Sequence, residues 1–314
     1  MATALTPEFL RKRLFALPKA ELHLHMYGAM RRSTLAELCA AAGRATPQFP
    51  AGKLADFAQF SDIFDAVKDC VACEGDLRRL VREVIEDQAA AGCSYVELQC
   101  SPQHLPDLPD DNAFWRTVFD EAASVSVRLG VTVRFISVIV RSLVSPEAAV
   151  VIAEDAVARA RAGDAIVGLG LAGAENDPTP FTAAFAVAKR GGLLCLPHQG
   201  ELDVQGGGPP FVNAAVELLG ADRLGHGIGS VASSATLAML ARKQVCCEVC
   251  PTSNVCIGGT AALAYSTHPL PQMLRAGVPC CLGTDDPTVS PQTVAWFQSV
   301  FQHLFDVTLC PRLI

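Results

Sequence analysis

Eight short apolar segments recur along this 314-residue sequence, and most neighbouring pairs are separated by enough residues for one helix and two loops. Each segment has the length and composition of a buried β-strand. The expected strands cover residues 20–25, 94–100, 131–140, 166–171, 193–198, 223–226, 245–249 and 279–284. Regular alternation of strands and helices indicates a parallel sheet, and eight such units predict an α/β fold of the (β/α)8 TIM barrel type.

The segments between the strands carry helix signals. Residues 76–92, DLRRLVREVIEDQAAAG, place five apolar side chains on one helical face before the closing glycine: Leu77, Leu80, Val81, Val84 and Ile85. Residues 146–163 begin with proline and end with glycine, as helices often do. The longest irregular stretch, residues 44–60, follows the first strand, and we expect it to form a lid over the barrel mouth.

An open doubly wound sheet is the alternative fold. It is disfavoured because neither a G-x-G-x-x-G nor a G-x-x-x-x-G-K-[ST] phosphate-binding loop follows a strand. We find no internal repeat, low-complexity tract or domain-dividing linker. The sequence therefore predicts one domain over residues 1–314.

Composition narrows the class of partner and the compartment. The net charge is −7 and no Lys/Arg run is present, so a nucleic-acid partner is not expected. The N-terminus lacks the apolar core of a signal peptide, and no apolar run approaches the ~20 residues of a membrane span. The 13 cysteines lie mostly in apolar runs, which favours reduced thiols in a cytoplasmic protein. A homo-oligomer is possible.

Polar side chains gather where the expected strands end. The first strand ends in His23-x-His25, within ELHLHMYG, and the fifth leads into His198 and Glu201 of HQGE. His226 ends the sixth strand, and Asp285 and Asp286 follow the eighth. Barrel active sites form at the carboxyl ends of the strands, so these residues should converge on one rim.

Three imidazoles and one carboxylate suit Zn²⁺, which accepts nitrogen and oxygen ligands and in catalytic sites keeps one position for water. Water on such an ion has a pKa of ~7 and is a nucleophile at neutral pH. The remaining Glu201, His226 and Asp286 would then serve as acid/base and hydrogen-bonding groups. This set predicts metal-assisted hydrolysis.

Each motif has an ordinary explanation when it is taken alone. His-x-His is frequently structural, TDDP (284–287) fits an Asx turn, and HQGE (198–201) could cap a helix. The ordered combination at strand ends favours a site. We expect ordinary surface or packing roles for the remaining histidines, His104, His268 and His303. We expect no second zinc site at the two Cys-x-x-Cys pairs, Cys70/Cys73 and Cys247/Cys250.

The motifs PKAELHLHMYG, LAGAE, HQGE, LGHG, PTSN and TDDP resemble those of the adenosine deaminase family of the amidohydrolase superfamily, from about residue 17 to 287. The resemblance implies a purine-metabolism hydrolase that binds one Zn²⁺ per chain through four ligands: His23, His25, His198 and Asp285. It implies attack of a metal-bound hydroxide on C6 of a 6-aminopurine, with release of ammonia and formation of a 6-oxopurine.

The resemblance also implies roles for the remaining site residues. Glu201 resembles the proton donor to purine N1, and His226 resembles the residue that orients or deprotonates the metal-bound water. Asp286 resembles the aspartate that contacts the hydroxide and purine N7, and Gly173 the backbone contact to N3. We also expect His25 to contact substrate. A protonated Glu201 requires a raised pKa, which a dry pocket would supply.

Three departures from the family pattern leave the substrate open. Tyr27 stands where the family has an acidic residue for the ribose 5′-hydroxyl, and Gln199 replaces a small residue. The chain stops at Ile314, soon after the expected eighth strand, so C-terminal helices of the family would be missing. We expect an adenosine-type substrate; a 5′-modified adenosine of the aminofutalosine type, N6-methyl-AMP, adenine, or a non-catalytic purine-binding role are the alternatives.

Overall fold

The computed structural model describes residues 17–50, 52–102, 110–202, 208–257 and 264–290. Eight parallel strands follow one another around a sheet in chain order. They are β1 (Lys19–His25), β2 (Cys93–Cys100), β3 (Thr132–Val140), β4 (Ile166–Ala172), β5 (Leu194–Gln199), β6 (Arg223–His226), β7 (Cys246–Val249) and β8 (Cys280–Leu282). The predicted strands are all present, and the (β/α)8 barrel is confirmed.

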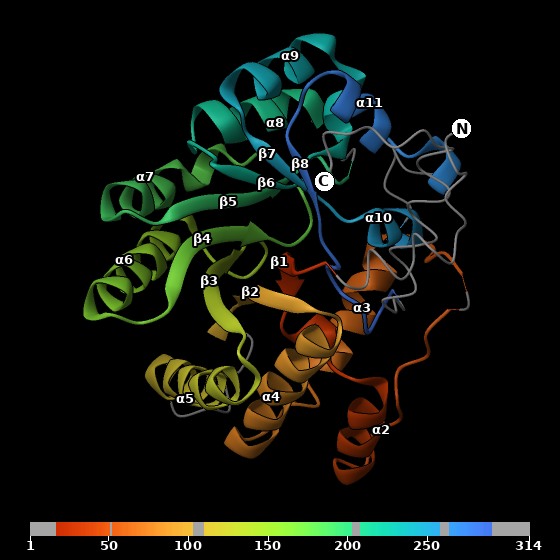
Figure 1. Cartoon of the computed structure of the whole chain (residues 1–314), viewed down its shortest axis with the longest axis vertical. Coiled ribbons are helices and arrows are strands. Elements are labelled where there is room, and N and C mark those ends of the chain that lie inside the picture. The colour runs from red at the N-terminus through yellow and green to blue at the C-terminus, as the bar shows by residue number, and fades with distance from the viewer. Residues whose placement is uncertain (1–16, 51, 103–109, 203–207, 258–263, 291–314) are drawn as a thin grey trace.

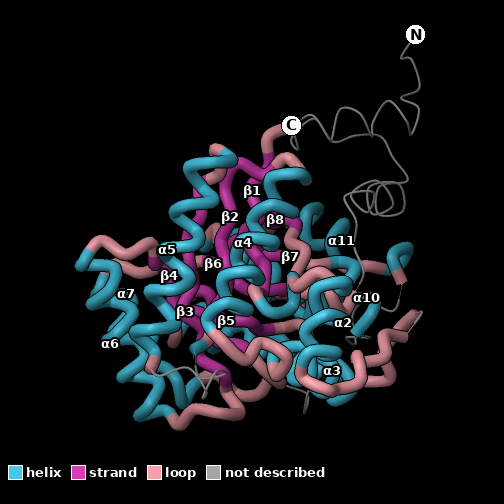
Figure 2. The backbone as a smooth tube through the Cα atoms, turned by 90° about the horizontal axis from the view of Figure 1, so that it is seen from below, coloured by secondary structure: helices cyan, strands magenta, loops and turns pink. Residues whose placement is uncertain are grey.

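Helices surround the strands as an outer layer (Figures 1 and 2). They are α2 (Arg32–Ala41), α3 (Phe57–Lys68), α4 (Glu74–Ala90), α5 (Asp111–Leu129), α6 (Pro146–Ala162), α7 (Thr182–Gly191), α8 (Gly208–Glu217), α9 (Ser234–Lys243), α10 (Pro251–Ile257) and α11 (Leu270–Arg275). Short 3-10 turns lie at η1 (Tyr27–Ala29), η3 (Thr179–Phe181), η5 (Ile228–Ala232) and η6 (Tyr265–Thr267). Among the described residues, no helix combines the length and apolarity needed to cross a membrane.

Local sequence explains where the predicted helices begin and end. The Ser145 side chain accepts a hydrogen bond from Ala148 N and caps α6, Pro146 opens the helix, and Gly163 ends it in the left-handed region at φ 99°. On α4 the five apolar residues of the predicted stripe are buried. These side chains are part of the buried core, so burial of one apolar face determines which side of the helix faces inward.

Backbone hydrogen bonds close the barrel between three residues that the sequence analysis assigned to the site. His25 N donates to Asp285 O at 3.1 Å, and Asp285 N donates to His23 O at 2.8 Å. These two bonds join the segment after β8 to β1. Because the seam itself carries these residues, barrel closure sets their relative positions.

The lid prediction for residues 44–60 is only partly right. The backbone is irregular up to Asp56 among the described residues, but residues 57–60 form the start of α3 and are not irregular. The Asp56 side chain accepts from Gln59 N and begins that helix, a capping signal that the prediction did not use. One-domain organisation over residues 1–314 stays a prediction, since both ends of the chain lie outside the described residues.

Candidate active site

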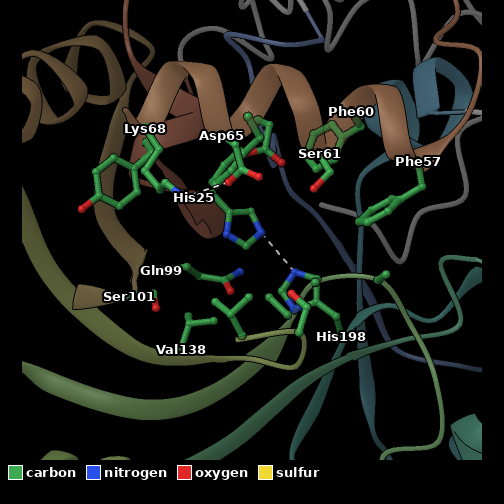
Figure 3. A pocket seen from close by; sticks show the side chains of 18 of the residues that line it. His25, Phe57, Phe60, Ser61, Asp65, Lys68, Gln99, Ser101, Val138 and His198 are labelled. Atoms are coloured by element: carbon green, nitrogen blue, oxygen red, sulfur yellow. Dashed lines mark hydrogen bonds and ion pairs between the residues drawn. The ribbon is translucent and has the colours of Figure 1, made fainter. Parts of the chain in front are cut away.

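Four potential ligand atoms converge at the barrel seam. His25 Nε2 lies 3.1 Å from His198 Nε2 (Figure 3). The same His25 nitrogen lies 3.3 Å from Asp285 Oδ1. His23 Nε2 lies 3.4 Å from the same Asp285 oxygen. Ligand atoms of all four residues lie within 4.8 Å of one another. The structure therefore brings together the four residues that the sequence assigned to a metal.

Two glycines make room for this cluster. A Cβ on Gly225 would lie 2.9 Å from His23 Cε1 and 3.0 Å from His198 Cγ, and one on Gly283 would lie 2.6 Å from His23 Cβ. Real Cβ atoms do not approach that closely, so the imidazoles occupy space that any larger residue would fill. The described backbone has three non-glycine residues at positive φ, and two are in the site: His226 at 62° and Asp285 at 63°. Such conformations cost of order 1–3 kcal/mol and concentrate at functional sites.

The charge balance of the cluster favours a cation. Burial opposes protonation of His23, but the carboxylates of Asp285 and Glu248 outweigh it and raise the His23 pKa to about 10. Burial also opposes ionisation of Asp285, yet the imidazoles of His23 and His25, whose Nε2 atoms lie 3.4 and 3.3 Å from Asp285 Oδ1, hold its pKa well below the usual value. Burial and the neighbouring imidazoles lower the pKa of His198, which keeps this ring neutral. The buried carboxylates thus favour positive charge in the cluster, which a proton on His23 or a bound cation can supply.

The donor set fits a divalent metal ion. His23 is fully buried, and its Nε2 has no hydrogen-bond partner, which is costly unless something binds it. Its other nitrogen, Nδ1, lies 2.7 Å from Glu248 Oε2. A carboxylate behind a ligating imidazole orients the ring and increases its basicity. Glu248 on one side and a bound cation on the other would thus satisfy both nitrogens of the buried His23 ring.

Acid/base groups border the same cluster. His226 Nε2 lies 3.5 Å from Glu201 Oε2 and 3.9 Å from Asp285 Oδ2. Burial and the Asp285 and Glu175 carboxylates raise the pKa of Glu201, which favours the protonated carboxyl that a general acid needs. Burial and Asp285 likewise raise the pKa of Asp286. Burial lowers the pKa of His226 to about 3, so its imidazole is neutral.

The loop that carries Glu201 is fixed by groups that the sequence analysis did not single out. Glu175 accepts hydrogen bonds of 3.0 Å from both Glu201 N and Leu202 N. Arg141 donates from Nη2 to the backbone oxygen of His198 and, at 3.3 Å, to Gln199 Oε1. The unusual glutamine thus binds a buried arginine. Two sequence signals were available for these roles: Glu175, the acidic residue of LAGAE, and Arg141, directly after an expected strand.

The glycine that closes ELHLHMYG also has a steric explanation. A Cβ on Gly28 would lie 1.7 Å from Asp286 Oδ1. No side chain fits there, so glycine lets η1 pass beside the Asp286 carboxylate. Gly173, at φ 91°, lies directly after β4 and lines the cavity described next.

A cavity of about 500 Å³ opens onto the cluster. It is lined by eight of the nine residues that the sequence assigned to the site, namely His25, Tyr27, Gly173, His198, Glu201, His226, Asp285 and Asp286; His23 lies behind them. Helix α3 covers the cavity, with Phe57, Phe60 and Lys68 facing it (Figure 3). Lys68 Nζ lies 2.9 Å from Asp65 Oδ1. The predicted lid over residues 44–60 included Phe57 and Phe60, but nothing in the sequence analysis pointed to the part of α3 after residue 60.

Of the other residues that the sequence analysis considered, Cys250 lies beside the cluster, with its ligand atom within 4.8 Å of those of His226 and Asp285. His104 and His303 lie outside the described residues. His268 is buried, and it contacts Asn254, which in turn contacts His226. The cysteines of the described ranges are free thiols.

A (β/α)8 barrel with a His/Asp cluster at its strand ends defines the class of metal-dependent barrel hydrolases. The adenosine deaminase family model matches residues 18–306. The chain belongs to this family, and it is a hydrolase that acts on C–N bonds of cyclic amidines.

Named relatives agree with the family. An adenosine deaminase of Serratia proteamaculans is 35% identical over 295 residues, covering 87% of this chain and 83% of the relative. An aminodeoxyfutalosine deaminase of Streptomyces coelicolor is 33% identical over 292 residues, covering 90% and 73%. The crystal structure of an adenine deaminase from Arthrobacter aurescens superposes with a TM-score of 0.80 at 26% identity, covering 92% of this chain and 88% of that one.

Proposed function

We propose that this protein hydrolyses the exocyclic amine of a 6-aminopurine nucleoside, with Zn²⁺ as cofactor, and releases the 6-oxopurine and ammonia. One observation carries the proposal. Three imidazole nitrogens and one carboxylate oxygen converge beside Glu201, a buried carboxyl group whose pKa is raised by burial and neighbouring carboxylates, at the end of a cavity. These are a metal site and a general acid within one enclosure.

The proposed ligands are His23, His25, His198 and Asp285. Nitrogen-rich donor sets with one carboxylate suit zinc better than the oxygen-preferring Mg²⁺ or Ca²⁺. When bound, the ion would act as a Lewis acid that activates water at neutral pH. Glu248, behind His23, would hold that ring in place.

Chain residues account for the proton and substrate steps. Glu201 donates its proton to purine N1, which allows C6 to accept the oxygen of water without building charge on the ring. His226 and Asp286 hold the attacking water, and Asp286 also contacts purine N7. Gly173 offers backbone contact at the ring edge. Glu201, now a carboxylate, takes up the proton that the water loses and passes it to the amine, so that the C6–N bond breaks and ammonia leaves.

The cavity supports a nucleoside with a substituted 5′ position, in preference to a free base. Its volume lies within the ~300–1,000 Å³ that holds drug-sized ligands. Tyr27 is 3% exposed, lines the cavity, and its hydroxyl has no partner. Phe57 and Phe60 offer apolar surface, whereas Lys68 is paired with Asp65 in the same lining. A 5′ substituent with an apolar body matches these groups, which is consistent with the aminodeoxyfutalosine deaminase among the relatives.

The test is ammonia release from adenine, adenosine and 5′-deoxyadenosine, with kcat/KM measured for each. Losing one hydrogen bond to a charged group costs ~1.5–3 kcal/mol, or roughly 10- to 150-fold in selectivity. We expect 5′-deoxyadenosine to compete well with adenosine in the wild type, and Tyr27→Asp to shift preference toward adenosine by about that factor. Tyr27→Phe, which removes only the hydroxyl, is the control and should leave the ratio within a few-fold.

Three results would contradict the proposal. A wild-type preference for adenosine of a hundredfold or more would show that the 5′-hydroxyl is required. An unchanged ratio in Tyr27→Asp would show that position 27 does not contact the 5′ end. Absence of ammonia release from all three purines by the zinc-loaded enzyme would contradict the reaction itself.

A further inference from the structure

A chain of buried hydrogen bonds runs from His226 away from the cavity. His226 Nδ1 lies 3.0 Å from Asn254 Nδ2, in α10. Asn254 Oδ1 lies 3.3 Å from His268 Nε2, and His268 Nδ1 accepts a bond of 3.1 Å from Leu270 N at the start of α11. The three side chains are 1%, 0% and 5% exposed, so water does not offer them alternative partners.

The donor and the acceptor of each of these hydrogen bonds can be assigned by starting from the bond between Leu270 N and His268. A backbone N–H can only donate, so His268 Nδ1 must be an unprotonated acceptor. His268 is therefore a neutral imidazole with its proton on Nε2, in keeping with burial, which lowers its pKa to about 4. That Nε2–H donates to Asn254, and the atom that receives it must be the amide oxygen.

The orientation of Asn254 then determines the tautomer of His226. With its oxygen toward His268, the amide turns its NH₂ group toward His226 Nδ1, which can only accept. A neutral His226 thus carries its proton on Nε2. That nitrogen faces the catalytic cluster, where it lies 3.5 Å from Glu201 Oε2.

We propose that Asn254 and His268 are positioning residues that fix the proton of His226 on Nε2, so that His226 serves the site as a hydrogen-bond donor and not as a base. The inference rests on the proposed function for its chemical meaning. An Nε2–H group has no lone pair to accept a proton from the attacking water. The proton that the water loses therefore goes to Glu201, which is a carboxylate once it has given its own proton to purine N1, while His226 orients the water oxygen.

The direct test is the protonation pattern of His226 in zinc-loaded protein labelled with ¹⁵N-histidine. Long-range ¹H–¹⁵N correlation spectra distinguish the two neutral tautomers and the imidazolium, and loss of one signal set in His226→Gln identifies this ring. We expect bare Nδ1 and protonated Nε2. A wild-type ring with its proton on Nδ1 would overturn the proposal, and this measurement needs neither substrate nor turnover.

A matched pair of variants tests the role of the relay. In Asn254→Asp the new carboxylate can only accept, so it should draw a proton onto His226 Nδ1 at nearly unchanged shape. Thr252→Val is the control: it removes the bond of Thr252 Oγ1 to Tyr265 Oη from the same helix without touching the relay. His226 signals should change in the first variant and stay as wild type in the second.

Kinetics give a second readout. We expect Asn254→Asp to lower kcat/KM roughly 10- to 100-fold, the usual effect of removing a partner behind a site residue, mainly through kcat. Thr252→Val should stay within a few-fold of wild type. Equal losses in both variants, or unchanged His226 signals in Asn254→Asp, would show that Asn254 acts only by holding α10. A wild-type Nε2–H pattern in a protein that deaminates no 6-aminopurine would leave the relay standing and refute the proposed function.

Discussion

Glu248→Gln should weaken metal binding without emptying the ligand set. Glu248 Oε2 lies 2.7 Å from His23 Nδ1, and its other oxygen is bonded to Arg223 Nε. Both the histidine and the carboxylate are almost fully buried. Glutamine preserves the shape of the side chain but removes its charge. His23 would therefore lose both basicity and the strong hydrogen bond that orients its ring.

The size of the effect follows from two independent considerations. Removing a partner behind a metal ligand typically costs 10–100-fold in metal affinity, which corresponds to about 1.4–2.7 kcal/mol. A hydrogen bond to a charged group is worth about 1.5–3 kcal/mol, which agrees. We therefore expect the dissociation constant for Zn²⁺ to rise 10- to 100-fold at pH 7.

The assay is competition for Zn²⁺ between the metal-free protein and a chromophoric chelator of known affinity. Glu97→Gln is the matched control, because Glu97 accepts a hydrogen bond from Nη2 of the same Arg223, and no hydrogen bond joins it to His23 among the described residues. The control should lose folding stability, like Glu248→Gln, but keep zinc affinity within about threefold. Equal losses of affinity in the two variants would refute the reasoning, as would an unchanged affinity in Glu248→Gln.

Three further predictions use other parts of the molecule. His198→Ala should abolish stoichiometric zinc by elemental analysis, and an unchanged metal content would remove His198 from the ligand set. Glu201→Gln should retain zinc but lower kcat by ~10²–10⁴-fold, since glutamine cannot deliver a proton; turnover within a few-fold of wild type would exclude Glu201 as the acid. Burial lowers the pKa of His268 from 6.5 to about 4, so the unfolded state binds more protons between these values and stability falls as the pH drops through this window, by at most about 3 kcal/mol. Denaturant unfolding at pH 7 and pH 4.5 should show a smaller acid loss for His268→Gln than for wild type, and equal losses would contradict the pKa.

Periodicity and residue type were sufficient for the strands. The run VRFISVIV, for example, forms β3 because a strand covered on both faces needs continuous apolar side chains. His23, His198, His226 and Asp285 were also accessible to sequence reasoning, because a parallel barrel collects the carboxyl ends of its strands on one rim. A pattern of eight strand–helix units therefore predicts both the fold and the end of the barrel at which the site lies.

Tertiary structure alone determined which groups support those residues. Glu248 and His23 are 225 residues apart and Asn254 and His226 are 28 apart, and no local pattern records that either pair is in contact. The lid prediction reached Phe57 and Phe60, but the contribution of the rest of α3 to the cavity was not expected, since the sequence does not show which surface a helix covers. Residue type and spacing specify local conformation and burial, whereas a hydrogen bond between distant side chains depends on how the closed barrel places them in space.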